Sequence, residues 1–287
     1  MINFIDMKLT PIETGNFKLD GGAMFGVVPK VMWSKVYPAD ENNLANWAMR
    51  CLLIEYGDKK ILIDNGIGNK QDQKFLSHYY LNGNATLEKS LANSGVKPED
   101  ITDMVLTHMH FDHCGGSVKY TSDHSGFELA FPNATYWVSK KQYNWATHPN
   151  RREKASFLKE NILPIEESGH LKMVEEEGEY IPGIEFKIYD GHTDGQIIPH
   201  IHINNKVVAY MADLMPSTAH IPMPWIMAYD TRPLQTLKDR ERFYKEALDN
   251  NYILFFEHDL YHEACTLEDT PKGARVRKAG KLKDFIA

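Results

Sequence analysis

Four side chains of the kind that bind metal ions fall within six residues of this 287-residue sequence: His108, His110, Asp112 and His113. They follow residues 103–107, a short apolar run that predicts a buried strand. Successive side chains of a strand point to opposite faces, so His108 and His110 are expected on the same side. A turn at Gly115 and Gly116 would carry Asp112 and His113 to a second position. Because four such ligands are too many for one open catalytic ion, the pattern predicts two metal ions side by side.

The alternative interpretation of this cluster is a histidine-rich loop that binds no metal. In that case three buried neutral histidines would each need a separate hydrogen-bond partner. Imidazole together with carboxylate suits zinc, which we expect, and also manganese, iron or cobalt. Cys114 adjoins the cluster, and we interpret it as a buried cysteine without a metal role.

Three further candidate ligands each stand just past a later apolar run. His192 follows residues 184–190, Asp213 follows residues 207–212, and His258 follows residues 252–257. A single histidine at the end of a strand is usually a hydrogen-bonded loop residue. The shared placement of these three residues is therefore stronger evidence for metal binding than any one of them alone. Together with the first four residues, they complete a ligand set for two ions.

Strand and helix patterns predict two batches of strands, each followed by helices. Hairpins are expected across Gly57–Asp58 and at Asn204–Asn205, and helices over residues 86–93 and from Thr231 to Leu248. Each batch could form one sheet with helices on its outer face. We therefore expect one domain over residues 1–287, with a helical insertion around residues 139–171.

Composition narrows the functional class. Lysine and arginine number 32 against 39 acidic residues, a net charge of −7, so nucleic acid is not an expected partner. The basic segment 272–283 is interpreted as a solvated terminal segment. No apolar run is long enough for a membrane span, and the first nine residues do not resemble a signal peptide. An odd number of cysteines, three, favours a reducing compartment, so we expect a cytoplasmic protein. A homodimer remains open.

The motifs T-H-M-H-F-D-H, G-H-T-D-G, M-A-D-L and F-E-H-D, in this order, resemble those of metallo-β-lactamase-fold hydrolases over residues 1–262. The segments L-D-G-G-A-M-F-G-V-V-P-K, I-D-N-G-I-G-N and P-W-I-M-A-Y-D are similar to the branch that holds N-acyl-homoserine-lactone lactonases, which are quorum-quenching enzymes. The resemblance implies an α/β fold, an αββα sandwich of two mixed sheets with helices outside. It implies one metal ion on His108, His110 and His192, and a second on Asp112, His113 and His258. Asp213 would bridge both ions.

The resemblance also implies hydrolysis by a hydroxide held between the two ions, with Asp112 and Asp213 handling protons. Asp64 and Thr107 are expected to support the ligands. The chain departs from the family where Asp194 replaces a proline, and where Pro216 replaces a tyrosine that lactonases use. Tyr229 and His220 are the candidates to replace that tyrosine.

The expected substrate is a lactone or ester with an apolar tail, such as an N-acyl homoserine lactone. Residues 215–229 carry three prolines and predict a loop rather than packed core. Six apolar residues are predicted to line the substrate pocket: Met24, Phe25, Trp33, Met223, Trp225 and Met227. The alternatives are a phosphotriesterase, an arylesterase or a thioester hydrolase on the same site, and a non-catalytic metal-binding sensor.

Overall fold

The computed structural model of the protein describes residues 7–286 and divides into two compact units. The first unit contains the residues up to Gly15 together with Met49–Glu176, and the second contains Asn16–Ala48 and the residues from Glu177 onward. The long strands β1 (Lys8–Asp20) and β2 (Leu44–Tyr56) each contribute residues to both units. The sequence analysis predicted that the first nine residues are not a signal peptide. Of these nine, residues 1–6 lie outside the described residues. The expectation of one domain over residues 1–287 stays a prediction.

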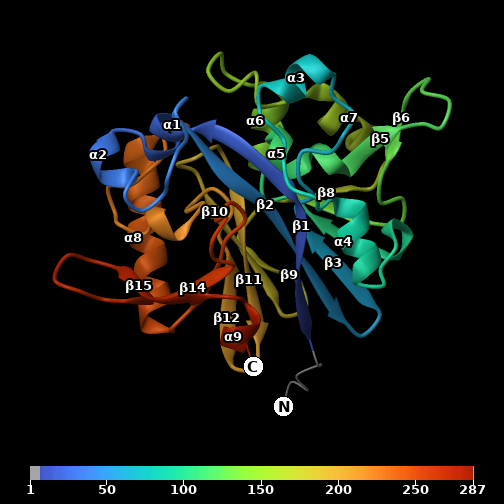
Figure 1. The fold of residues 1–287 in the computed structure, drawn as a ribbon. Coiled ribbons are helices and arrows are strands. Elements are labelled where there is room, and N and C mark those ends of the chain that lie inside the picture. The colour runs from blue at the N-terminus through green and yellow to red at the C-terminus, as the bar shows by residue number, and fades with distance from the viewer. Residues whose placement is uncertain (1–6, 287) are drawn as a thin grey trace. The chain divides into compact units, whose positions relative to one another are not determined.

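The first unit is built on a mixed sheet in the order β1-β2-β3-β4-β7-β8 (Figure 1). Its remaining strands are β3 (Lys59–Ile63), β4 (Asp103–Val105), β7 (Thr135–Ser139) and β8 (Leu171–Val174). Strands β2 and β3 are antiparallel, with Tyr56 opposite Lys59, so the predicted hairpin is confirmed. Strands β3, β4, β7 and β8 run parallel to one another.

Short helices and one small hairpin complete the first unit. The helices are α3 (Gln73–Ser77), α4 (Leu87–Asn93), α5 (Phe111–Cys114), α6 (Lys140–Thr147) and α7 (Lys159–Glu167), and the hairpin pairs β5 (Val118–Tyr120) with β6 (Phe127–Leu129). The side chain of Thr86 caps α4, as its sequence predicts. Helices α6 and α7 confirm helical structure in the 139–171 segment. Their residues Tyr143, Ile162 and Ile165 pack in the same core as Leu62 and Met104 of the sheet.

The second unit is built on a mixed sheet in the order β15-β14-β13-β12-β11-β10-β9. These strands are β9 (Gly178–Ile181), β10 (Ile184–Tyr189), β11 (Gln196–Ile203), β12 (Lys206–Tyr210), β13 (Ile253–Phe255), β14 (Ala264–Glu268) and β15 (Arg275–Gly280). The predicted turn between β11 and β12 is confirmed, and Asn204 and Asn205 both have positive φ, as a two-residue hairpin turn requires. Helix α8 (Pro233–Asp249) connects β12 to β13, which run parallel. Helices α1 (Gly21–Phe25), α2 (Lys30–Trp33) and α9 (Lys283–Ile286) also belong to this unit.

Three local predictions for the second unit need correction. Helix α8 begins at Pro233 after Arg232, and the Thr231 hydroxyl donates to the His192 carbonyl instead of capping the helix. The basic segment forms the edge strand β15 and helix α9, because β14 offers a free edge with which β15 pairs. The segment 215–229 is irregular, as predicted, yet Met215 and Met227 are buried. Prolines remove backbone hydrogen bonds but do not prevent side chains from packing.

Among residues 7–286, the structure contains no helix that is both long enough and apolar enough to cross a membrane.

Candidate metal centre

The histidine cluster lies where strand β4 passes into helix α5. His108 and His113 are fully buried, whereas His110 and Asp112 keep 7% and 9% of their surface exposed. The two glycines that follow allow this tight packing. A Cβ on Gly115 would lie 2.1 Å from the Ile67 carbonyl oxygen, and a Cβ on Gly116 would lie 2.4 Å from that of Asn65. Larger residues would therefore push the cluster out of place.

The far side of the His108 ring is held by Thr107. The Thr107 hydroxyl lies 2.7 Å from Oδ2 of Asp64, to which it donates, because a carboxylate only accepts. The hydroxyl oxygen is then left to accept the hydrogen of His108 Nδ1, 3.1 Å away. The other ring nitrogen of His108, Nε2, consequently presents a lone pair.

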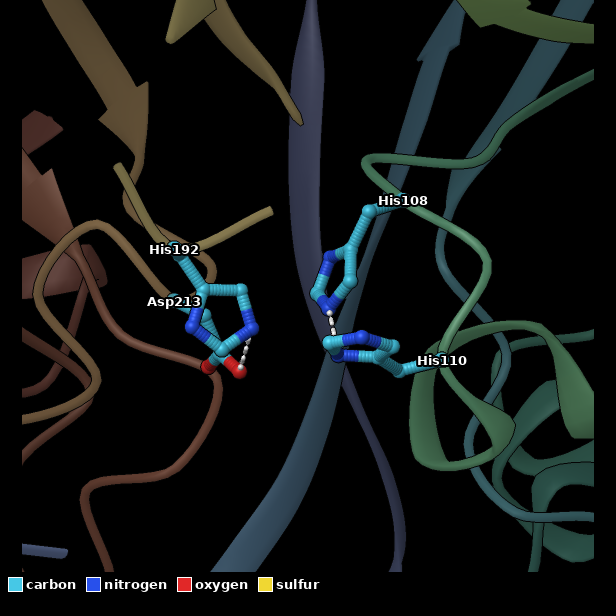
Figure 2. Close-up of side chains that lie close together, drawn as sticks. All are labelled: His108, His110, His192 and Asp213. Atoms are coloured by element: carbon cyan, nitrogen blue, oxygen red, sulfur yellow. Dashed lines mark hydrogen bonds and ion pairs between the residues drawn. The ribbon is translucent and has the colours of Figure 1, made fainter. Parts of the chain in front are cut away.

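His110 is oriented in the opposite sense. Its Nε2 lies 3.2 Å from Oε1 of Glu153, so Nε2 carries the hydrogen and Nδ1 presents the lone pair. Nε2 of His108 and Nδ1 of His110 are 3.0 Å apart (Figure 2). Two lone pairs at this distance repel each other unless a cation lies near both. With Zn–N bonds of about 2.0–2.1 Å, two nitrogen ligands of a tetrahedral ion lie roughly 3.3 Å apart. The pair therefore fits a metal ion.

Asp112 and His113 form the second group of ligand atoms in this unit. Nδ1 of His113 donates to Oδ2 of Asp64 over 3.0 Å, and Nε2 lies 3.8 Å from Oδ2 of Asp112. Asp64 is fully buried and also accepts the backbone N–H of Thr107. The supporting contacts expected of Asp64 and Thr107 are thus present.

In the second unit, Asp213 presents one carboxylate oxygen to each of two histidines. Oδ2 lies 3.1 Å from Nε2 of His192 (Figure 2), and Oδ1 lies 3.2 Å from Nε2 of His258. The Nδ1 atoms of both rings face fixed acceptors, Asp230 Oδ1 at 3.1 Å for His192 and the Ala48 carbonyl at 2.8 Å for His258. Both Nε2 atoms are thereby directed at Asp213.

The electrostatics around His192 favour a positive charge. Burial alone would disfavour the charged ring, but the carboxylates of Asp213 and Asp230 outweigh it and raise the pKa of His192 to about 10. Two carboxylates that stabilise a cation here would stabilise a metal ion in the same way. Asp194, which stands where the family usually has a proline, pairs with Arg232.

The structure thus brings together His108, His110, Asp112 and His113 within the first unit, and His192, Asp213 and His258 within the second. Sequence reasoning missed Glu153 and Asp230, which hold His110 and His192. Sequence spacing could not have identified either residue, because each lies 38 or more residues from the histidine that it contacts.

The predicted catalytic candidate His220, proposed to replace the lactonase tyrosine, is fully buried. Its Nε2 donates to the Met24 carbonyl over 2.9 Å, and its Nδ1 accepts from the Ser217 hydroxyl over 2.8 Å. The ring stacks on Phe25 at 4.5 Å. Burial lowers the pKa of His220 to about 3, so the ring is neutral near pH 7. Tyr229, the other candidate, is 40% exposed.

The predicted pocket residues differ in exposure. Met24, Phe25, Trp33 and Met227 are buried, while Met223 and Trp225 are half-buried. Phe25 stacks on Trp33 at 5.2 Å and meets the edge of Trp225 at 5.9 Å. These rings form part of the core of the second unit, and their role as a substrate pocket stays a prediction.

The sequence model of the metallo-β-lactamase superfamily matches residues 50–258, which include every predicted metal ligand. The chain belongs to this superfamily. The predicted fold class, α/β with mixed sheets, is thereby confirmed, and the protein is a metal-dependent hydrolase of this type.

Several relatives show the same relationship. The structure of a probable metal-dependent hydrolase from Staphylococcus aureus is 32% identical, with a TM-score of 0.87, covering 97% of this chain and 98% of that chain. An N-acyl homoserine lactonase of Bacillus cereus is 26% identical over 77% of this chain and 85% of its own length. The dizinc quorum-quenching lactonase AidC has a TM-score of 0.79 at 22% identity, covering 96% of this chain and 95% of that chain, and shows the shared fold.

Proposed function

We propose that this protein hydrolyses lactones or esters that carry an apolar tail, such as N-acyl homoserine lactones, with two divalent metal ions. The observation that carries the proposal is the orientation of five histidine rings. In each ring an acceptor faces one nitrogen, and the other nitrogen is left directed toward the place where a metal ion would bind. The similarity to N-acyl homoserine lactonases supports this substrate class.

The ligand assignment follows the family resemblance. One ion would be held by His108, His110 and His192, the other by Asp112, His113 and His258, with one oxygen of Asp213 for each. Bound ions would lower the pKa of a water molecule to about 7 and polarise the substrate carbonyl. We expect zinc, since imidazole dominates the donor set.

The residues of the chain would then orient the substrate and handle protons. Asp112 is a buried carboxylate that retains some exposure, so it could accept a proton from the attacking water and return it to the leaving alkoxide as the ester bond breaks. Tyr229 is exposed whereas His220 is buried, which favours Tyr229 as the candidate to polarise the carbonyl.

An apolar tail is favoured by the half-buried Met223 and Trp225, which follow Asp213 in the chain. Each methylene buried on binding contributes at most about 0.8 kcal/mol, roughly fourfold in kcat/KM. Efficiency should therefore rise along a series of acyl homoserine lactones from short to long tails.

The decisive experiment combines metal analysis with that series. Purified protein is expected to hold close to two equivalents of metal, and to cleave long-chain lactones faster than short ones. A phosphotriester, an aryl ester, a thioester and a phosphodiester serve as comparison substrates. If kcat/KM does not change along the lactone series, or is higher for one of the comparison substrates, the lactone assignment is wrong. Two bound metals with no hydrolysis of any substrate would favour the metal-binding sensor.

A further inference from the structure

Glu153 is a buried acidic residue outside every motif of the sequence. It lies between α6 and α7 and is only 4% exposed. One carboxylate oxygen, Oε1, accepts from His110, as described above. The other, Oε2, accepts from the Trp145 indole N–H over 2.6 Å and from the Asn150 amide over 2.8 Å. Both oxygens are therefore held by separate donors, and the carboxylate has a fixed orientation.

The chain on either side of Glu153 also contacts the histidine cluster. The Ser156 carbonyl accepts the backbone N–H of Phe111, which follows His110, over 3.0 Å. The Phe157 ring packs against the His110 ring with centroids 4.8 Å apart. His110 is thus held by a hydrogen bond at Nε2 and by a ring contact.

The negative charge of Glu153 favours a cation on the opposite nitrogen of the His110 ring. Burial of a carboxylate is costly, and the hydrogen bonds from Trp145 and Asn150 add no positive charge of their own. A cation on Nδ1 of His110 would polarise the ring, make its Nε2–H a stronger donor and stabilise the carboxylate. In return, the carboxylate makes Nδ1 a better ligand.

We propose that Glu153 is a positioning residue that fixes His110 to bind a metal ion through Nδ1. This rests on the proposed function, since it assumes that His110 is a ligand. The 139–171 segment would then serve the metal centre as well as the core of the first unit.

A purely structural role for Glu153 makes a different prediction. If Glu153 only ties Trp145 and Asn150 to the core, then removing the indole donor should matter as much as removing the carboxylate. Trp145→Phe deletes the N–H donor to Oε2 and leaves the contact with His110. Glu153→Gln weakens the carboxylate that faces His110. Glu175→Gln, at an exposed ion pair with Lys140, is the matched control.

The experiment measures zinc affinity by competition with a chelator, the visible absorption of the cobalt-substituted protein, and thermal unfolding of the metal-free protein. We expect Glu153→Gln to weaken binding of one zinc equivalent by 10- to 100-fold and to change the cobalt spectrum, as is typical when a carboxylate behind a histidine ligand is lost. Trp145→Phe should lower the unfolding temperature with little change in affinity or spectrum, and Glu175→Gln should match the wild type in all three.

Three outcomes decide between the two roles. Wild-type affinity and spectrum in Glu153→Gln would overturn the proposal, as would equal losses of affinity in Glu153→Gln and Trp145→Phe. If Glu153→Gln does not fold, Glu153→Asp withdraws the carboxylate by one methylene while keeping its charge, and wild-type zinc affinity there would overturn the proposal. Failure of the proposed function is seen separately, as a wild-type protein that binds no metal or cleaves no lactone.

Discussion

Oδ2 of Asp64 lies 3.0 Å from Nδ1 of His113, although 49 positions separate the two residues in the sequence. Asp64 sits directly after β3 and has a positive φ of 55°, so it is a strained position for a residue other than glycine. Its burial and its contacts with Thr107 and His113 explain why a carboxylate is kept there.

Asp64→Asn is therefore expected to weaken metal binding. An amide that turns its N–H toward His113 would favour the wrong ring tautomer, and the charge that strengthens the ligand is lost. We expect zinc affinity to fall about 10- to 100-fold. Competition titration checks this, with Asp58→Asn in the exposed β2–β3 turn as the matched control. Equal affinities in the two variants would show that Asp64 does not act through His113.

Asp213→Asn should disturb both metal ions, because the two carboxylate oxygens face different histidines. An asparagine offers only one oxygen, and its NH₂ group cannot bind a cation. Elemental analysis should show clearly fewer than two equivalents, and lactone hydrolysis should fall by at least 100-fold, about 2.7 kcal/mol in activation free energy. Two retained metals with normal turnover would contradict the bridging role.

Stability should fall in mildly acidic solution because of His220. Burial disfavours the charged ring and lowers the pKa of His220 to about 3 in the folded protein, whereas the pKa of an exposed histidine is about 6.5. The unfolded chain therefore binds the proton first, and stability is lost as the pH falls from 6.5 toward 3. Between pH 6.5 and 5 the loss is about 2 kcal/mol. Urea unfolding at pH 7 and pH 5 should show a smaller loss for His220→Gln than for the wild type. Identical losses would mean that His220 titrates normally.

Arg240 should be a large contributor to the stability of the loop after Asp213. Its buried guanidinium donates to the carbonyls of Leu214 at 3.0 Å, His220 at 2.8 Å and Trp225 at 3.0 Å. Arg240→Met would leave these acceptors without a donor, at a cost of about 3 kcal/mol or more. Arg242→Met, at a partly exposed arginine of the same helix, should cost about 1 kcal/mol or less. Urea unfolding of both variants measures the difference, and equal costs would refute the role of Arg240.

Much of the fold was predictable because its signals are local. The hairpin across Gly57–Asp58 and the turn at Asn204–Asn205 depend on a few adjacent residues with known backbone preferences. Thr86 before α4 is a signal of the same kind. The pairing of β15 with β14 was missed, because a basic, half-exposed strand has no pattern that distinguishes it from a solvated tail.

The candidate ligands were predictable for a different reason. His108, His110, Asp112 and His113 are close in sequence, and His192, Asp213 and His258 each follow a strand that is itself recognisable. The metal-binding chemistry of these side chains depends on residue type and spacing, both of which can be read from the amino-acid sequence. The sequence by itself therefore determined the superfamily and supplied the candidate ligands of a metal ion.

Only the tertiary structure decided which nitrogen of each ring is directed at a ligand site, and which residues do the directing. Glu153, Asp64 and Asp230 reach their histidines across 38 to 49 positions, over distances that sequence spacing does not encode. The same holds for His220, whose residue type suggested chemistry until burial and two hydrogen bonds placed it in the core. A hydrogen bond depends on the distance and direction between two atoms, and for residues far apart in the chain these are set only when the fold is complete.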